Sequence, residues 1–467
     1  MWPGISEGGF TVKLFRKPAL LFLILLLALA GVRIAPALTL EEALREALAK
    51  NPEILARGHE VRAAGSAVRA ERGKLLPQIN FMAQASRLSD PQPVVSIKGP
   101  GKFPAFSRDI YLSEVDLVLP LYAGGRLRKR VRIAEIERAL RESLKDQTAL
   151  DLLANVKDTF YLGLYLRELV SAREKTLSAL RREEKEAELR LKVGRIPPLD
   201  LLRIRTQVRA EEAALAAARE GLRRAKEALS VLLGRPPESD FELEGSILRV
   251  QKPKEVSPDL ALSCRPDILA QREAVRKAEE LAALAFREHF PELDLYSSYG
   301  RKAGSGFNHS EEVWEAGVRL RLNLFSGGTI SARVAEARSR ALAERERLRL
   351  LELSARREIA DALSLIAQAE EEVAHLEAAR ATAREAFRVE SVRYRTGAGT
   401  VTDMLLAQAA WARAEADYLG ARYRLAKAYV AYERATTLLA RGWLKLRCWN
   451  IINSESKNLE EEKWPGK

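Results

Sequence analysis

Strict alternation of apolar and polar residues marks two segments of the chain as β-strands. In residues 314–325 and in residues 111–121, the apolar positions fall on one face and charged residues fall on the other. Because successive side chains of a strand point to opposite sides, each segment predicts one apolar and one polar surface. The charged positions opposite the apolar faces are Glu114, Asp116, Arg319 and Arg321.

A weaker strand pattern precedes each of these segments, near residues 78–88 and 292–301. The first pair is separated by residues 89–110, whose prolines and glycines predict an exposed loop. Each strand has about ten residues, the length that crosses a bilayer as a tilted strand. A soluble sheet with one face on a core would alternate in the same way.

The number of strands helps to decide between a membrane sheet and a soluble sheet. A sheet in a membrane cannot leave its edges unpaired. Membrane barrels begin at about eight strands, so a membrane sheet would need strands from at least two chains. The four charged residues named above would then line a wet lumen.

Two very long helices are predicted over residues 126–193 and 329–396. Neither contains proline, and each would extend roughly 100 Å at about 1.5 Å per residue. A Gly-Gly pair precedes each helix, and Gly194 or Gly397 interrupts it before a shorter helix returns. Because a helix of this length cannot bury its apolar stripe within one compact domain, it requires neighbouring helices along its whole length.

These elements occur twice, in the same order. Four segments recur: residues 51–56 as 265–270, 77–81 as 291–295, 121–125 as 324–328, and 194–200 as 397–403. The first two segments recur after 214 residues and the last two after 203, and this difference of eleven residues falls in residues 89–110. The repeat predicts one structural unit over residues 38–250, with its strand pair at 78–121, and a second over 251–441, with its strand pair at 292–325. Residues 442–467 form a tail.

The start of the chain has the pattern of a signal peptide. Three basic residues precede an apolar run over residues 19–30, and small residues around Ala37 follow. The run is too short to span a bilayer as a helix. We therefore expect residues 1–37 to be removed before Leu38 and the rest to be exported. An uncleaved anchor is the alternative, and no cysteine near the cut supports a lipid anchor.

The charge and composition of the chain argue against several classes of function. Residues 1–37 carry four basic and one acidic residue, so their removal lowers the net charge from +13 to +10. The remaining charges alternate in sign along helices, which is typical of a solvated face rather than of a nucleic-acid site. The four histidines are scattered and no phosphate-binding loop is present, so neither an enzyme nor a cofactor is predicted. Cys264 and Cys448 could pair in an oxidising compartment or remain two thiols.

The order of motifs resembles the TolC family of outer-membrane efflux proteins. The resemblance runs from Leu38 to about Leu439 and rests on order, spacing and duplication together. The motifs are Leu-Thr-Leu-Glu-Glu-Ala-Leu at 38–44 with Asn51-Pro52, both helix–proline–strand junctions, both Gly-Gly pairs, and the segments 190–202 and 393–405 around the glycine breaks. No single motif is diagnostic.

The resemblance implies a mainly α-helical protein with a membrane β-barrel part. Three copies would form a twelve-stranded β-barrel continued by a twelve-helix α-barrel across the periplasm. An equatorial collar would comprise residues 235–264 and the C-terminal tail. Such a protein conducts substrates out of the cell, in tripartite efflux or type I secretion. A periplasmic adaptor and an inner-membrane pump of the RND, ABC or MFS type would be its partners, together with outer-membrane lipid.

The glycine breaks are where the resemblance places contact with the adaptor. Val193, Gly194, Thr396 and Gly397 are the candidate docking residues. A glycine in the middle of a helical hairpin supplies a positive φ that other residues take only at a cost. The same glycines could serve as turn residues without a partner role.

The resemblance also implies a periplasmic gate formed by Asp200, Asp403 and Tyr394. Six carboxylates from three chains would favour cations and repel one another. An aspartate at a helix start can instead cap the helix. This chain departs from the family's gate, because Leu406 stands in place of a second aspartate and Gly399 in place of the lock arginine.

A periplasmic coiled-coil adaptor or structural protein is the competing prediction, since adaptors also combine a signal peptide with long helical hairpins. Adaptors usually carry one hairpin with soluble β-domains, whereas this chain carries two copies of a strand–strand–long-helix unit. Whether the cargo is a small molecule or a protein is left open by the sequence.

Overall fold

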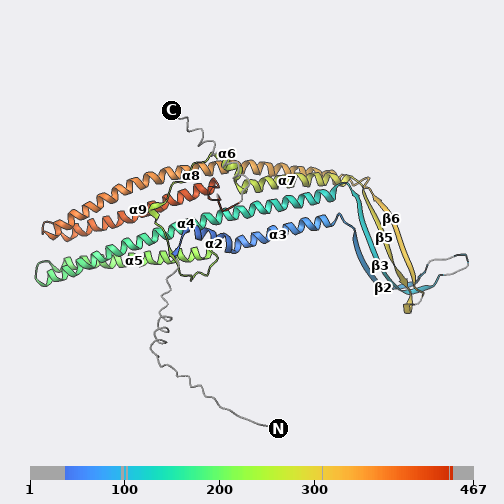
Figure 1. The fold of residues 1–467 in the computed structure, drawn as a ribbon, viewed down its shortest axis with the longest axis horizontal. Coiled ribbons are helices and arrows are strands. Elements are labelled where there is room, and N and C mark those ends of the chain that lie inside the picture. Colours follow the sequence, from blue (N-terminus) through green and yellow to red (C-terminus); the bar gives the residue numbers. More distant parts are fainter. Residues whose placement is uncertain (1–36, 96–98, 101–103, 308, 441, 445–467) are drawn as a thin grey trace, which may run out of the picture.

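A computed structural model describes residues 37–95, 99–100, 104–307, 309–440 and 442–444. The molecule is elongated, with a β-sheet at one end, helices along the middle, and the tips of two helical hairpins at the other end (Figure 1). The predicted signal peptide before Ala37, Cys448 and most of the C-terminal tail lie outside the described residues.

Each repeat has the same sequence of main elements. The first consists of α2 (Leu40–Lys50), α3 (Pro52–Gly73), β2 (Gln78–Pro93), β3 (Phe106–Ala123), α4 (Arg126–Lys192) and α5 (Pro198–Leu232). The second consists of α6 (Pro258–Cys264), α7 (Pro266–Phe286), β5 (Glu292–Ala303), β6 (Glu311–Arg321), α8 (Thr329–Arg395) and α9 (Val401–Ala435). The short elements are β1 (Ala37–Leu38), β4 (Glu242–Leu243), η1 (Ile247–Arg249), η2 (Arg287–His289), η3 (Ser305–Phe307) and η4 (Leu438–Ala440).

The repeat is regular down to helix length. Helices α4 and α8 both have 67 residues, and α5 and α9 both have 35. The predicted long helices are therefore confirmed to within one residue at each end. In the part of the chain that the structure describes, none of the helices is both long and apolar enough to cross a membrane.

The four strands form one antiparallel sheet in the order β2-β3-β5-β6. The strand boundaries differ from the prediction. Residues 89–93 and 106–110, expected in the loop, extend β2 and β3. Pro91 lies where the register between β2 and β3 is irregular, between Arg87 and Gln92, and Pro93 is the last residue of β2, so neither interrupts a regular ladder.

Strand β6 is shorter than predicted. It ends at Arg321 rather than Phe325, because its partner strand begins at Glu292, directly opposite Arg321. β6 has no second neighbour in the described sheet that could pair with the residues beyond. Leu324 and Phe325 continue past the strand and are 87 % and 88 % exposed.

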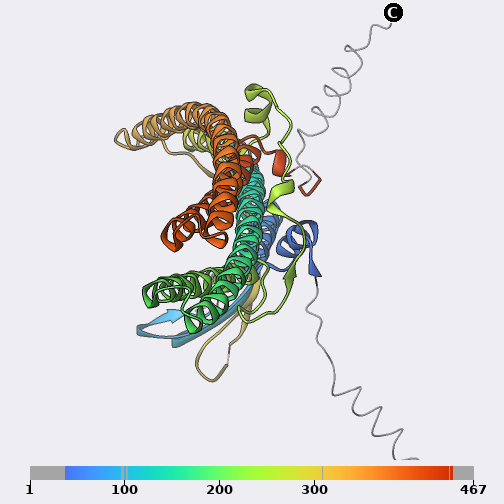
Figure 2. The ribbon, with the colours of Figure 1, turned by 90° about the vertical axis from the view of Figure 1, so that its left-hand side faces the viewer.

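The helices form a curved layer near the sheet and two separate pairs near the tips. Helix α4 contacts α3 and α7, and α7 contacts α8. Farther from the sheet, α4 pairs with α5 and α8 pairs with α9. Figure 2 looks from the tips along the molecule and shows these two hairpins as distinct pairs.

The main hydrophobic core lies where the two hairpins meet the rest of the molecule. Residues of α4 such as Leu153 and Phe160 pack there with Phe241 and Ile247 from the segment between the repeats. Strand β1, at the start of the described chain, pairs in parallel with β4 of this segment. Residues of the segment 235–264, the part of the expected collar that the structure describes, thus pack on the helices at mid-height. Cys264 is fully buried among them.

The two repeats use the same contact to attach the start of one helix to the end of another. Asn51 precedes α3, and its Nδ2 donates to the carbonyl of Leu232 at the end of α5, at 2.9 Å. Arg265 precedes α7, and its Nη1 donates to the carbonyl of Ala435 at the end of α9, at 3.2 Å. Asn51 also caps its helix by accepting from the backbone N–H of Glu53 at 2.9 Å.

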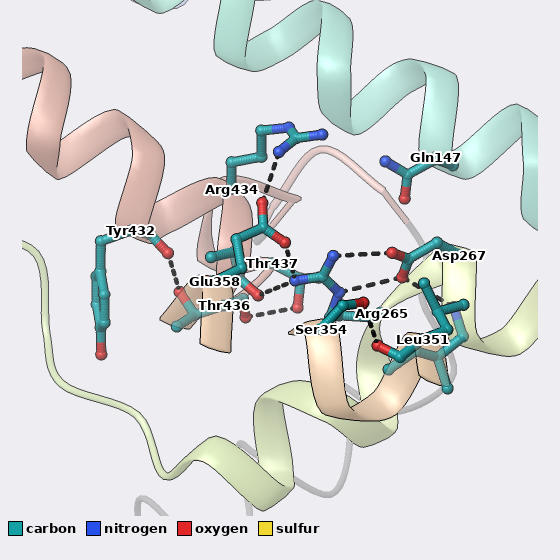
Figure 3. Close-up of polar contacts among 12 residues, drawn as sticks. Gln147, Arg265, Asp267, Leu351, Ser354, Glu358, Tyr432, Arg434, Thr436 and Thr437 are labelled. Atoms are coloured by element: carbon teal, nitrogen blue, oxygen red, sulfur yellow. Dashed lines mark hydrogen bonds and ion pairs between the residues drawn. The ribbon is translucent and has the colours of Figure 1, made fainter. Parts of the chain in front are cut away.

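The arginine in the second repeat extends this contact into an ion cluster (Figure 3). Arg265 is 7 % exposed and donates two hydrogen bonds to Asp267, at 3.1 and 2.8 Å. It also lies 2.7 Å from Glu358 of α8. Arg434 of α9 joins Glu358 to Asp151 of α4, each at 2.7 Å. The cluster therefore links both repeats at the equator.

Candidate functional site

The two hairpin tips have the same backbone geometry. Gly194 and Gly397 adopt φ of +70° and +79°. After each glycine, the next backbone N–H, of Arg195 or Ala398, donates to the carbonyl five residues earlier at 2.8 Å. This is a helix C-cap that requires a left-handed residue, for which glycine is best suited. The predicted tips are thus at the expected positions.

The tips are open on their outer side. Val193 is 68 % exposed, and Gly194, Thr396 and Gly397 are exposed as well. A Cβ added at either glycine would meet no atom within 4 Å. The four candidate docking residues therefore form two similar protruding surfaces whose shape is set by the backbone.

Tyr394 connects the two hairpins just behind the tips. It belongs to α8, yet it is only 8 % exposed and shares a hydrophobic cluster with Leu201 and Ile204 of α5. The guanidinium carbon of Arg190 lies 5.4 Å from the centre of its ring. Burial raises the pKa of the Tyr394 phenol, and the Asp200 carboxylate raises it further, while Arg190 opposes this.

The two candidate gate aspartates have different surroundings. Asp200 lies in the first turn of α5, with a side chain 19 % exposed and 3.9 Å from Arg203. Asp403 lies in the first turn of α9, where the Thr400 hydroxyl donates to its Oδ2 at 2.8 Å. The Asp403 backbone N–H in turn donates to that hydroxyl at 3.1 Å. Asp403 is therefore part of a helix cap, whatever other role it has.

Arg203 is a residue near Asp200 that the sequence did not reveal. From α5 it donates to the Thr402 hydroxyl of α9 at 2.7 Å, across 199 residues of sequence. It thus joins the two hairpins on the surface, next to the buried Tyr394. Gly399 stands where the resemblance would place an arginine. In this chain, Arg203 of the other hairpin makes the polar connection between the hairpins.

The four charged residues predicted to share a face of the sheet do so. Asp116 lies opposite Ser298, which lies opposite Glu315, and Arg319 lies opposite Asp294. Directly opposed residues point to the same side of a sheet, as do alternate residues of one strand. By this register the shared face carries Glu114, Asp116, Arg319 and Arg321.

The shared charged face is interconnected, whereas the other face is apolar and uncovered. Arg319 lies 4.5 Å from the centre of the Tyr296 ring, and the Tyr296 hydroxyl donates to Glu315 at 2.8 Å. Arg321 donates to Asp294 at 3.2 Å. On the apolar face, the following are more than half exposed: Ile79, Phe81, Tyr299, Trp314, Val318 and Leu320.

The structure thus separates the predicted residues into two sites at opposite ends of the molecule (Figure 1). Tyr394 and Asp200 lie close together behind the tips, with Arg203 as an unpredicted neighbour. Asp403 forms its hydrogen bonds with Thr400 of its own hairpin.

Comparisons with known proteins agree with this architecture. The family described as "Outer membrane efflux protein" matches residues 43–235 and 257–437. The cobalt-zinc-cadmium resistance protein CzcC of Cupriavidus metallidurans is 26 % identical over 46 % of this chain and 50 % of its own length. The outer membrane efflux protein BepC of Brucella suis is 25 % identical over 74 % of this chain and 76 % of its own. The chain thus spans half the length of the first relative and about three quarters of the second.

Among solved structures, the Campylobacter jejuni CmeC outer membrane channel has the same fold. It superposes with a TM-score of 0.75 at 18 % identity, covering 90 % of this chain and 89 % of that one. This match shows the fold, and the family match favours an outer-membrane efflux protein over the periplasmic adaptor that the sequence left as an alternative.

Proposed function

Since the chain belongs to the outer membrane efflux protein family, we propose that three copies form an outer-membrane exit duct. The duct would conduct substrates passively in a tripartite efflux or type I secretion system. An inner-membrane pump, of the RND, ABC or MFS type, and a periplasmic adaptor would deliver the substrates. The family is located in the outer membrane, and the helices of this chain would extend from it as a tunnel through the periplasm.

The observation that carries the proposal is the four-stranded sheet with an exposed apolar face and two unpaired edges, β2 and β6. In a bilayer such edges must be paired, and three sheets joined edge to edge would close a twelve-stranded barrel. The apolar faces would then contact lipid. Glu114, Asp116, Arg319 and Arg321 would line the water-filled interior, where ionised groups remain hydrated.

Reconstitution of the purified chain tests the proposal. We expect a detergent-dependent trimer that migrates faster on a denaturing gel before heating than after it, and stepwise ionic current in planar bilayers. Recovery of a water-soluble monomer that passes no current would overturn the proposal.

At the periplasmic end, Asp200 and Asp403 are proposed as a ring of six carboxylates that favours cations. The change Asp403→Asn removes the charge but keeps an oxygen that can accept from Thr400, so it separates the gate role from the capping role. We expect Asp200→Asn and Asp403→Asn to lower the cation-to-anion permeability ratio, measured as the reversal potential in a salt gradient. Glu346→Gln on the exposed surface of α8 is the control. An unchanged ratio in both aspartate variants contradicts the ring.

Tyr394 is proposed to hold the tips together. Tyr394→Ala removes a buried aromatic side chain at a cost of about 3 kcal/mol, which is roughly a hundredfold shift toward separated hairpins. The expected result is a larger single-channel conductance in planar bilayers. Tyr394→Phe keeps the ring and should stay close to the original conductance.

The variant Arg203→Ala is a second test of the contact between the two hairpins. It removes one exposed hydrogen bond, so its effect on conductance should be smaller than that of Tyr394→Ala. Equal conductance in all three variants and the unmodified chain would mean that this contact does not hold the tunnel closed.

The tips themselves are proposed as the docking surface for the adaptor, through Val193, Gly194, Thr396 and Gly397. Their exposure and their matched geometry support this role.

A further inference from the structure

Cys264 is the last residue of α6 and lies in the main hydrophobic core of the molecule. Its side chain is fully buried, in the same cluster as Phe241 and Ile247 of the segment between the repeats. It is the one cysteine among the described residues, and its sulfur is part of a disulfide. The sequence contains one other cysteine, Cys448 in the C-terminal tail. Within one chain, Cys448 is therefore the only thiol with which Cys264 can pair.

The end of the described chain reaches the core that contains Cys264. The chain turns back at Ala440, whose carbonyl accepts from the backbone N–H groups of Trp443 at 3.1 Å and Leu444 at 2.9 Å. The side chains of Trp443 and Leu444 are half-buried and pack on this core. Cys448 follows Leu444 by four residues, which extend over at most about 14 Å. The Cys448 thiol is thus attached to the core by a short tether.

We propose that Cys264 and Cys448 of the same chain form a disulfide that fixes the C-terminal tail to the equator. Two S–H bonds break and one S–S bond forms, which releases two protons and two electrons. A dithiol–disulfide oxidoreductase of the export compartment would accept the electrons, and its own disulfide would be reduced to two thiols. The bond rests on the proposed export of the chain, because export places it in oxidising surroundings. It does not depend on conduction.

The disulfide would join the beginning of the second repeat to its end. Cys264 directly precedes Arg265, the centre of the equatorial ion cluster, whereas Cys448 follows the end of α9. The two cysteines lie 184 positions apart. Because a cross-link that closes a long loop restricts the unfolded chain, it stabilises the folded one. The bond would therefore reinforce the junction at which the ion cluster links both repeats.

Peptide mapping tests the pairing directly. The full chain, purified from the cell envelope without reductant, is denatured, treated with N-ethylmaleimide and digested with trypsin. We expect residues 255–272 and 448–457 to be recovered as one disulfide-linked pair without maleimide, and as two separate peptides after reduction. Recovery of both peptides unlinked and carrying maleimide would overturn the proposal. Covalent dimers on a non-reducing gel would also overturn it, because the bond would then join two chains.

A thermal measurement tests whether the bond fixes the tail to the folded chain. Cys448→Ser leaves Cys264 in the core and should lower the melting temperature of the helical circular dichroism signal by several degrees. Reduction should lower the melting temperature of the unmodified chain by the same amount and should not change that of Cys448→Ser. The control is Ser456→Ala in the same tail, which should melt as the unmodified chain does. Equal melting temperatures for Cys448→Ser and the unmodified chain would show that the bond fixes nothing.

Discussion

Gly397→Trp is expected to abolish export in cells while leaving the trimer in the outer membrane. The glycine has φ of +79° and open space around the position of a Cβ. The bulky side chain therefore costs about 1 kcal/mol of backbone strain but collides with nothing inside the chain. It would instead change the outer shape of the tip, which is the proposed surface for the adaptor. The measurement is growth in the presence of those compounds to which deletion of the gene makes the cells sensitive.

Gly397→Ala is the matched control, because it has the same backbone strain with little added volume. We expect it to keep most of the export, so that the difference between the two variants reports shape alone. The amount of heat-modifiable trimer in the outer membrane should be equal in both. Full export by Gly397→Trp would exclude this tip from docking.

Arg265→Ala is expected to have the largest effect on stability. Removal of the guanidinium leaves Asp267 without its ion-pair partner, leaves Glu358 paired with Arg434 alone, and removes the donor to the Ala435 carbonyl. Breaking a buried ion pair in this way costs about 3–5 kcal/mol, and because Glu358 is 36 % exposed we expect the lower end of this range. The melting temperature of the helical circular dichroism signal should fall by several degrees.

The repeat provides a matched comparison for this variant. Asn51→Ala removes the equivalent contact in the first repeat and a helix cap, with a cost of about 1–2 kcal/mol. Arg349→Ala removes an exposed ion pair and should cost close to zero. The double variant Arg265→Met with Glu358→Leu should recover part of the loss, because only the partly exposed Asp267 then remains without its partner. Equal melting temperatures for Arg265→Ala and Arg349→Ala would contradict a stabilising role.

The sequence predicted those features that depend on local chemistry. The ends of α4 and α8 followed from glycines, and the polar face of the sheet followed from alternation. In each case the determining residues lie within one turn or one strand of the feature they determine.

Features that join distant segments were not predictable in this way. The bond from Arg203 to Thr402 spans 199 residues, and nothing near Arg203 distinguishes it from the other helical arginines. The cluster around Arg265 requires four helices to meet at one point. The extent of β6 depended on where β5 begins, and that of β2 on an irregular stretch of register that accommodates its prolines.

The identical lengths of α4 and α8 place a constraint on how this protein can change. One residue inserted into either helix would move its tip by about 1.5 Å and turn it by about 100° relative to the other. Tyr394 would then rotate out of its pocket on the neighbouring hairpin, and the two tips would no longer end at the same level. Insertions in α4 or α8 should therefore be tolerated only in pairs, one in each repeat. The connections between β2 and β3 and between β5 and β6 can instead lengthen in one repeat alone.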